Sequence, residues 1–303
     1  MKTLCSKIQF KNFEVGEFGE IRNRTLDETL KLTYDFPWET ERALASVELH
    51  CPSVTIEHPS GSFLKIGPYF SGKFCVYHCG KRGKVTYLVL NELNEITSPV
   101  TDFFKGELNL SGFQKYKYVI NPLQYFKTNP YEYKPGSKAI FNYLKLDLVT
   151  VVAPAFIIFT QFFTNWSMLA NPYATCAILG FITLFCGPGM YLLFDYEPYY
   201  QHQYLKISRG HRYFIFGDVD GNKEYDKAEI FEICRYYNHR GRNSWSGSQV
   251  YKLVFKDGKI LIFSSLLITE WAFVKKFPGA EIKSEHIFFP TMDNTLIKIQ
   301  RIN

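Results

Sequence analysis

The sequence predicts an α+β membrane protein, in which a two-helix transmembrane hairpin lies between an N-terminal antiparallel α+β domain and a C-terminal mostly-β domain. The first observation is that residues 148–194, 47 in a row, contain no Asp, Glu, Lys or Arg, although 21% of the chain is charged. About 20 apolar residues span the bilayer hydrocarbon, so this run is long enough to cross twice. The second observation is that short runs of alternating apolar and polar residues, separated by glycine-containing turns, lie on both sides of this segment. This pattern is typical of antiparallel strands.

The hairpin is expected within residues 146–194, with spans at about 148–166 and 173–194. An Asn- and Pro-containing stretch between them favours a turn. Basic residues flank the run on both sides, namely Lys134, Lys138 and Lys145 before it and Lys206, Arg209 and Arg212 after it. Because positive residues stay on the cytoplasmic side, we expect a multi-pass protein of the cytoplasmic or cell inner membrane with both termini cytoplasmic. The alternative is a hairpin buried in a soluble core.

Composition restricts the class of protein further. The 303 residues leave room for a cytosolic domain at 1–115, a juxtamembrane linker at 116–145 and a second cytosolic domain at 196–303. The net charge of +6 is modest and partly lies at the hairpin flanks, which argues against nucleic acid as a partner. Seven cysteines, an odd number spread along the chain, indicate free thiols. Two spans enclose no pore, so a channel would require a homo-oligomer.

The N-terminal domain combines helix boundaries with strand runs. Thr25 and Glu28 match a capping box, and Ser98, Pro99 and Gly106 frame a second short helix. Between them lie four strand-like runs, at residues 54–58, 62–66, 73–78 and 84–90. Glycine-containing turns separate these runs and predict an antiparallel meander with helices on one face.

Cysteine and histidine side chains near residue 75 raise the question of a metal site. On a strand, Cys75 and Cys79 lie about 13 Å apart, too far for one tetrahedral zinc or for a disulfide. The neighbouring His78, His50 and Cys51 do not change this. Unless a turn falls inside the run, the sequence predicts no metal here.

Parts of the N-terminal domain have a pattern of strand and turn residues that is found in a known group of proteins. The segments at residues 52–57, 63–67, 72–77 and 102–104 resemble small bacterial α+β proteins of the immunity type, which neutralise toxins in interbacterial competition. The likeness covers about residues 46–106. It implies binding of a protein partner, a toxin, through a sheet face or edge, and it brings no catalytic residues.

The C-terminal domain has strand runs at residues 204–207, 213–216, 230–237, 250–255 and 260–263, followed by a helix at 269–277. Strands closed by a helix directly after a two-span hairpin resemble bacterial membrane proteins with a pleckstrin-homology-like domain. The likeness covers about residues 200–280. About 25 residues continue past the helix that should end that fold. Either the domain has additional strands, or it shares only the general arrangement of elements with those proteins.

An acidic segment in this domain has the spacing of a calcium loop. Oxygen-bearing residues stand at positions 1, 3, 5, 7, 9 and 12 of a twelve-residue window, namely Asp218, Asp220, Asn222, Glu224, Asp226 and Glu229. Lys223, however, occupies the position that needs glycine, and a strand-like run stands where the entering helix belongs. A polar hairpin turn is therefore expected, with no bound calcium.

These observations favour a non-enzymatic, membrane-anchored protein-interaction module, and the resemblance implies an immunity protein that neutralises a toxin at the inner face of the membrane. The alternative is a lipid-responsive sensor or scaffold. For that role the lipid-headgroup candidates are basic side chains: Lys206, Arg209, Arg212, Arg235, Arg240 and Arg242. No phosphate-binding loop, nucleophile elbow or paired-histidine motif is present, so we expect no catalytic residues, metal or cofactor.

Overall fold

The computed structural model describes residues 2–42, 49–50, 52–117, 120–137, 139–141, 143–145, 172–238 and 247–292. The chain forms two compact units. The first unit comprises Met1–Tyr131 together with Ser208–His211, and the second comprises Glu132–Ile207 and Arg212–Asn303.

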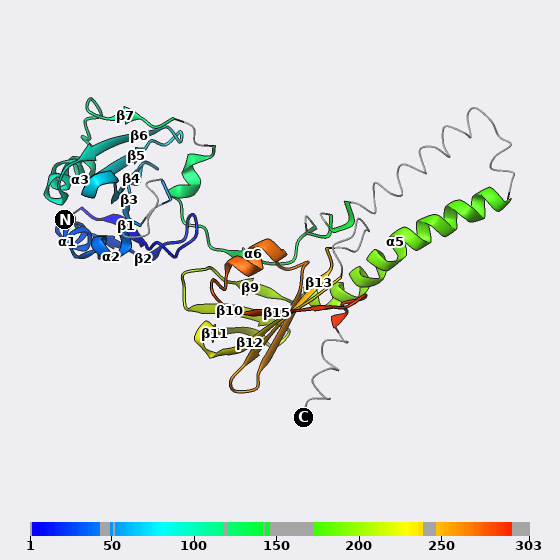
Figure 1. Ribbon diagram of the computed structural model, residues 1–303. Helices are drawn as coiled ribbons and strands as arrows, with labels where there is room; N and C mark the ends of the chain where they lie inside the picture. Colours follow the sequence, from blue (N-terminus) through cyan, green and yellow to red (C-terminus); the bar gives the residue numbers. More distant parts are fainter. Residues whose placement is uncertain are drawn as a thin grey trace, which may run out of the picture. The chain divides into compact units, whose positions relative to one another are not determined.

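The first unit is built on a seven-stranded antiparallel sheet. Its order is β2-β1-β3-β4-β5-β6-β7, and the labels follow that order in Figure 1. The strands are β1 (Leu4–Gln9), β2 (Gly19–Arg24), β3 (Ser53–Glu57), β4 (Phe63–Pro68), β5 (Phe74–Cys79), β6 (Val85–Leu90) and β7 (Gln114–Lys115). The expected meander is present as β3 to β6. The strands β1, β2 and β7 extend it on both sides.

Helices cover one face of this sheet. They are α1 (Leu26–Asp35), α2 (Trp38–Arg42) and α3 (Thr97–Lys105). The expected capping box starts α1, because Thr25 Oγ1 accepts a hydrogen bond from the Glu28 amide at 3.3 Å while the Thr25 amide donates to Glu28 Oε2 at 2.8 Å. Gly106 ends α3 with φ +84°, which glycine adopts without strain. Apolar side chains of the helices pack on those of the strands to form one core.

Loops cover the other face of the sheet, and this face contains buried charge. Lys7, Thr55 and Lys65 are register partners across β1, β3 and β4, and each is at most 1% exposed. Lys65 Nζ donates to Gln9 Oε1 at 2.9 Å and to the Tyr125 carbonyl at 3.2 Å. Lys7 Nζ lies 3.4 Å from Glu57 Oε2. These acceptors compensate for the loss of hydration that burial imposes on an ammonium group.

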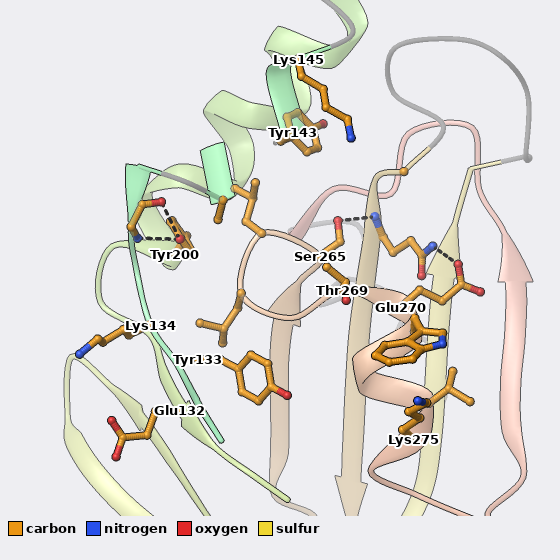
Figure 2. Close-up of a pocket in the computed structure, with 18 residues that line it drawn as sticks. Glu132, Tyr133, Lys134, Tyr143, Lys145, Tyr200, Ser265, Thr269, Glu270 and Lys275 are labelled. Carbon is orange, nitrogen blue, oxygen red and sulfur yellow. Dashed lines mark hydrogen bonds between the residues drawn. The ribbon is translucent and has the colours of Figure 1, made fainter. Parts of the chain in front are cut away.

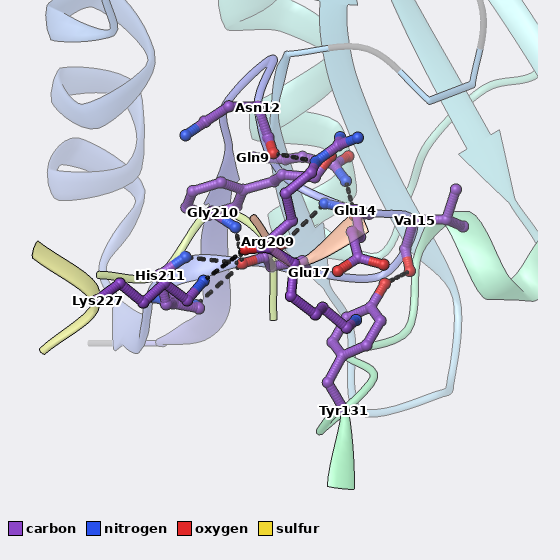
Figure 3. A network of polar contacts seen from close by, with 12 residues as sticks. Gln9, Asn12, Glu14, Val15, Glu17, Tyr131, Arg209, Gly210, His211 and Lys227 are labelled. Atoms are coloured by element: carbon purple, nitrogen blue, oxygen red, sulfur yellow. Dashed lines mark hydrogen bonds and ion pairs between the residues drawn. The ribbon is translucent and has the colours of Figure 1, made fainter. Parts of the chain in front are cut away.

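The segment Ser208–His211 belongs to the first unit through a buried carboxylate, shown in Figure 3. Glu17 is 1% exposed, and its Oε1 accepts hydrogen bonds from the Gly210 amide at 2.8 Å and the His211 amide at 3.0 Å. A Cβ on Gly210 would lie 2.0 Å from Phe13 Cδ1. Only glycine therefore fits this close approach without movement of Phe13.

The second unit contains two four-stranded sheets. Their orders are β11-β10-β9-β8 and β14-β13-β12-β15. The strands are β8 (Glu132–Tyr133), β9 (Tyr204–Lys206), β10 (Tyr213–Asp218), β11 (Gly221–Asp226), β12 (Ile230–Tyr237), β13 (Gln249–Phe255), β14 (Ile260–Ser264) and β15 (Ile282–His286), and the helices are α5 (Pro172–Tyr200) and α6 (Glu270–Lys275). Side chains of both sheets, α5 and α6 form a single core. Past α6, β15 pairs in parallel with β12, which accounts for part of the expected C-terminal extension.

Four short 3-10 helices complete the described elements. They are η1 (Phe70–Gly72), η2 (Leu93–Ile96), η3 (Pro122–Tyr125) and η4 (Lys227–Glu229). The helix η2 runs directly into α3, so α3 begins at Thr97 and not after Ser98 as the sequence indicated.

The structure contradicts the expected transmembrane hairpin. Among the described residues, no helix has both the length and the apolar character that crossing a membrane requires. The fold is mostly β, and the predicted multi-pass location in a cytoplasmic or inner membrane, with both termini cytoplasmic, is wrong on the same finding. The first expected span, residues 148–166, lies outside the described residues.

The described part of α5 gives a physical reason for this correction. The helix continues past the expected end of the second span to Tyr200 and carries Asp195 and Glu197. Leu192, Leu193 and Tyr196 are at most 7% exposed and pack in the core of the second unit. Apolar residues in this half of α5 therefore bury a helix against sheets, a role that hydropathy alone does not distinguish from insertion in lipid.

Candidate functional site

The headgroup candidates predicted from sequence do not form one cluster among the described residues. Lys206 Nζ lies 3.9 Å from Glu132 Oε1, and Arg209, in the first unit, donates to the carbonyls of Asn12 and Phe13. Arg240 and Arg242 lie outside the described residues.

The two remaining candidates each pair with a carboxylate. Arg212 Nε donates to Asp226 Oδ2 at 2.8 Å, and this bond raises the pKa of Arg212 and lowers the pKa of Asp226. Arg235 pairs with Glu270, and its guanidinium lies 4.8 Å from the centre of the Tyr237 ring. The role of all six candidates in headgroup binding stays a prediction.

A pocket in the second unit has the size of a ligand site. It has a volume of about 1010 Å³, at the upper end of the range for small-molecule sites. One wall contains Tyr200 and α6 with Thr269 forms another, and the turn after β14 lies between them (Figure 2). The first wall also contains Glu132, Tyr133, Lys134, Gly136, Ala139, Tyr143 and Lys145. Segments far apart in sequence thus meet here.

Partly buried hydrogen bonds link the walls of the pocket. Tyr200, 2% exposed, accepts a hydrogen bond from the Gly136 amide at 2.8 Å and donates to the Gly136 carbonyl at 3.3 Å. The turn after β14 is tied to β13 because the Gln249 amide donates to Ser265 Oγ at 3.1 Å. Gln249 Nε2 in turn donates to Glu270 Oε2 at 2.8 Å and orients the start of α6. These bonds connect Gly136 to α5, the turn after β14 to β13, and β13 to α6.

The interior of the pocket is mainly apolar. Leu266 and Leu267 form part of the lining, and α6 contributes Trp271 and Val274. Trp271 is 71% exposed and Val274 is 42% exposed, although both are large apolar residues. Exposed apolar groups in a concavity favour a ligand that covers them.

The rim of the pocket is positively charged. Lys134, Lys145 and Lys275 line it, and within the described part of the chain no carboxylate forms an ion pair with any of the three. The two acidic lining residues already have partners, since Glu132 lies near Lys206 and Glu270 pairs with Arg235. Lys275 Nζ lies 3.3 Å from the centre of the Trp271 ring, a cation–π contact that positions it at the edge. We call this site the lysine-rimmed pocket.

The lining of the lysine-rimmed pocket combines lysine ammonium groups with apolar and aromatic side chains. The hydroxyl of Ser265 accepts a hydrogen bond from the Gln249 amide. A rim of ammonium groups above apolar and aromatic side chains suits a ligand with an anionic end and an apolar body.

The other sites considered from sequence have structural roles in the described residues. Asp218 lies at the turn of the β10–β11 hairpin and Asp226 at its open end, so these acidic residues are spread along a hairpin. Cys75 and Cys79 lie on β5, and burial raises the pKa of Cys79 to about 11. No group of three or more potential metal ligands is found in the part of the chain that the structure describes, and Cys51 lies outside it.

The second unit has two four-stranded sheets, antiparallel except for the β12–β15 pair, and α6 follows β14. A family model described as a PH domain matches residues 131–276, from just before β8 to the end of α6. PH domains are typically non-catalytic modules that bind lipids or proteins. The match confirms the predicted likeness of the C-terminal domain to pleckstrin-homology domains.

The remaining comparisons give no second family. No curated protein and no solved structure matches the chain. Nothing found supports the expected resemblance to immunity-type proteins or to two-span membrane proteins, and the prediction of a membrane-anchored immunity protein is corrected accordingly.

Sequence reasoning missed the lysine-rimmed pocket as a site. Lys134 and Lys145 were noticed, but as residues flanking a membrane span. The available signal was the short pair Glu132–Tyr133, which forms β8 and pairs with β9. Recognising that pair as a strand would have placed residues 132–145 inside the β-domain.

Proposed function

We propose that the chain is a lipid-responsive interaction module, whose PH-type unit binds the acidic headgroup of a lipid in the lysine-rimmed pocket. The observation that carries the proposal is the set of three rim lysines without an acidic partner among the described residues, around an apolar interior. The match to a PH domain supports binding as the activity. It favours the sensor or scaffold alternative over the immunity protein.

The apolar lining favours a lipid over a free phosphate compound. A soluble phosphate would engage the lysines but leave Leu266, Trp271 and Val274 uncovered. A lipid supplies both parts, because its headgroup meets the rim while the adjoining glycerol and acyl carbons cover the interior. Burial of that apolar area adds about 25 cal/mol per Å² to the binding free energy.

The charges of the three rim lysines determine how much they are expected to contribute to lipid affinity. A basic residue near an anionic lipid surface contributes about 1 kcal/mol. Three of them contribute about 3 kcal/mol, equivalent to a change of about 100-fold in affinity. The contribution decreases with salt concentration, because mobile ions screen exposed charges.

Vesicle flotation of the full chain tests the proposal. Vesicles of phosphatidylcholine alone are compared with vesicles that also contain phosphatidylserine or a phosphoinositide. We expect binding to the acidic vesicles, and a large loss of binding when Lys134, Lys145 and Lys275 are all replaced by Gln. The matched control replaces Lys31, Lys105 and Lys223, exposed lysines away from the pocket, and should bind as the wild type does.

Two outcomes would contradict the proposal. Equal binding by the rim variant and the control variant would show that the lysine-rimmed pocket is not the site. Binding of a soluble inositol phosphate as tightly as of the corresponding lipid would show that the apolar interior plays no part, and the ligand class would change from lipid to free phosphate.

A further inference from the structure

A groove in the first unit, remote in sequence from the PH match, has different chemistry. Five aromatic residues line it, namely Tyr69, Phe70, Tyr77, Tyr87 and Tyr116. Lys115 and Lys117 complete its edge, and its volume is about 410 Å³. We call it the tyrosine groove. Its volume suits one or two side chains, so a folded domain or a whole lipid does not fit inside it.

The sheet and one tight turn build the groove. Tyr77 and Tyr87 are register partners on β5 and β6, and Tyr87 Oη donates to Gln114 Oε1 of β7 at 2.8 Å. The Tyr116 ring stands at 86° to the Tyr87 ring, with centroids 5.9 Å apart. On the other side, Ser71 with φ +54° forms a tight turn beside Phe70, which is 62% exposed. The aromatic walls are thus held by backbone geometry, while Phe70 is accessible.

The groove lies at the edge of the seven-stranded sheet. The strand β7 is the last in the order, consists of two residues and is exposed at both. No described strand pairs with its outer side. An exposed edge strand offers backbone amide and carbonyl groups to an extended segment from another chain.

The positive charge of the groove favours a partner segment with negative charge. Lys115 and Lys117 are exposed, and no carboxylate in the described residues forms an ion pair with either. No acidic residue is among the lining residues. An incoming segment with carboxylates therefore meets positive charge without competition from the chain itself.

We propose that the tyrosine groove is a second binding site, which takes an extended acidic segment of a partner protein that pairs with the outer edge of β7. Its carboxylates contact Lys115 and Lys117, and one aromatic or apolar side chain enters between the tyrosines and Phe70. This site is independent of lipid binding by the second unit.

Fluorescence anisotropy with three labelled peptides tests this proposal on the full chain. The first peptide alternates Glu with Val and has a central Tyr. The second has Lys in place of each Glu, and the third keeps the Glu residues but has Pro in place of Val. We expect saturable binding of the first peptide only, because the second has the wrong charge, and in the third every Pro lacks an amide donor and fixes φ near −65°, away from the strand conformation.

Variants of the groove locate the binding. Replacing Lys115 and Lys117 by Gln should weaken binding of the first peptide by about threefold to tenfold, in line with two exposed charge pairs. Phe70→Ala should also weaken it, and its exposure makes a folding defect unexpected. The matched control replaces Lys31 and Lys105 by Gln and should bind normally. Circular dichroism confirms that each variant is folded.

Five results would overturn the proposal or its pairing with β7. The first is the absence of saturable binding by the acidic peptide, and the second is equal binding by the Lys peptide. The third is unchanged affinity in the Lys115→Gln, Lys117→Gln variant. The fourth is loss of vesicle flotation in that variant with peptide binding intact, which would assign the groove to lipid. Binding of the Pro peptide as tight as that of the first would overturn the pairing with β7.

Discussion

Two sets of lysines, one in each unit, have opposite environments. In the first unit, Lys7 and Lys65 are at most 1% exposed, and hydrogen-bond acceptors surround their ammonium groups. In the second, Lys134, Lys145 and Lys275 border a cavity without an acidic partner among the described residues. A buried charge with satisfied hydrogen bonds stabilises one arrangement of its neighbours, whereas an accessible charge without a partner is available to a ligand. The environment of a lysine, and not its presence, thus indicates its function.

The largest effect that tests this comparison is expected at Lys65. The Lys65→Ala change leaves Gln9 Oε1 and the Tyr125 carbonyl without their donor and opens a cavity, so it should lower the free energy of unfolding by about 3 kcal/mol. Urea denaturation measures it. Lys65→Met keeps the aliphatic stem and should cost about half as much. A loss below about 1 kcal/mol for Lys65→Ala would mean that the buried ammonium is not structural.

The strands of the structure differ in how well the sequence predicted them. The runs that became β3 to β6 are rich in β-branched and aromatic residues, and their turns contain glycine, so they were predictable. The strand β1 was not, because Lys7 and Gln9 interrupt its apolar pattern although loops bury them. The strand β11 has the sequence Gly-Asn-Lys-Glu-Tyr-Asp and was interpreted as part of a turn. Local pattern does not report burial by distant segments.

The candidate site was less predictable than the fold, for a related reason. Its lining comes from residues 132–145, Tyr200 and residues 247–275, with no fixed spacing to recognise. The absence of charge in residues 148–194 was interpreted as a membrane signal. In the described half of α5, however, Leu192 and Tyr196 pack against sheets. The PH-like architecture was predictable, because strands ending in a helix leave a local pattern.

The second prediction concerns the pH dependence of the first unit. Burial, with smaller contributions from Lys65 and Arg209, lowers the pKa of His50 from 6.5 to about 4. Between these values the unfolded chain binds a proton that the folded chain does not, so stability falls as the pH decreases through this window. His50 is partly exposed, and solvent screening reduces the expected loss to about 1–2 kcal/mol.

Comparison with a variant isolates this effect from other titrating groups. The difference in unfolding free energy between wild type and His50→Gln is measured at pH 7 and near pH 4. We expect the difference to shift against the wild type at the lower pH. A difference that is the same at both values would show that His50 is protonated in the folded chain as readily as in the unfolded one.

The third prediction addresses the wall of the lysine-rimmed pocket. Tyr200→Phe removes the hydroxyl that bonds both the amide and the carbonyl of Gly136. Loss of a partly buried hydrogen bond should lower the free energy of unfolding by about 1 kcal/mol. It should also weaken lipid binding, since Gly136 lies in the pocket wall two residues from Lys134. Reduced stability with unchanged vesicle flotation would show that the Tyr200 hydroxyl stabilises the fold but does not contribute to lipid binding.

The smallest expected change in stability per substitution is at the rim lysines, and it separates the two uses of lysine most clearly. Lys134 and Lys145 are exposed and Lys275 is half-buried, so replacing all three by Gln removes no buried hydrogen bond of the described residues. The free energy of unfolding should therefore change by no more than about 0.5 kcal/mol per substitution, as at other surface positions. Binding to acidic vesicles should nevertheless fall far more than in the Lys31, Lys105, Lys223 control. If the rim variant loses as much stability as Lys65→Ala, these lysines are structural, and the distinction drawn from burial fails.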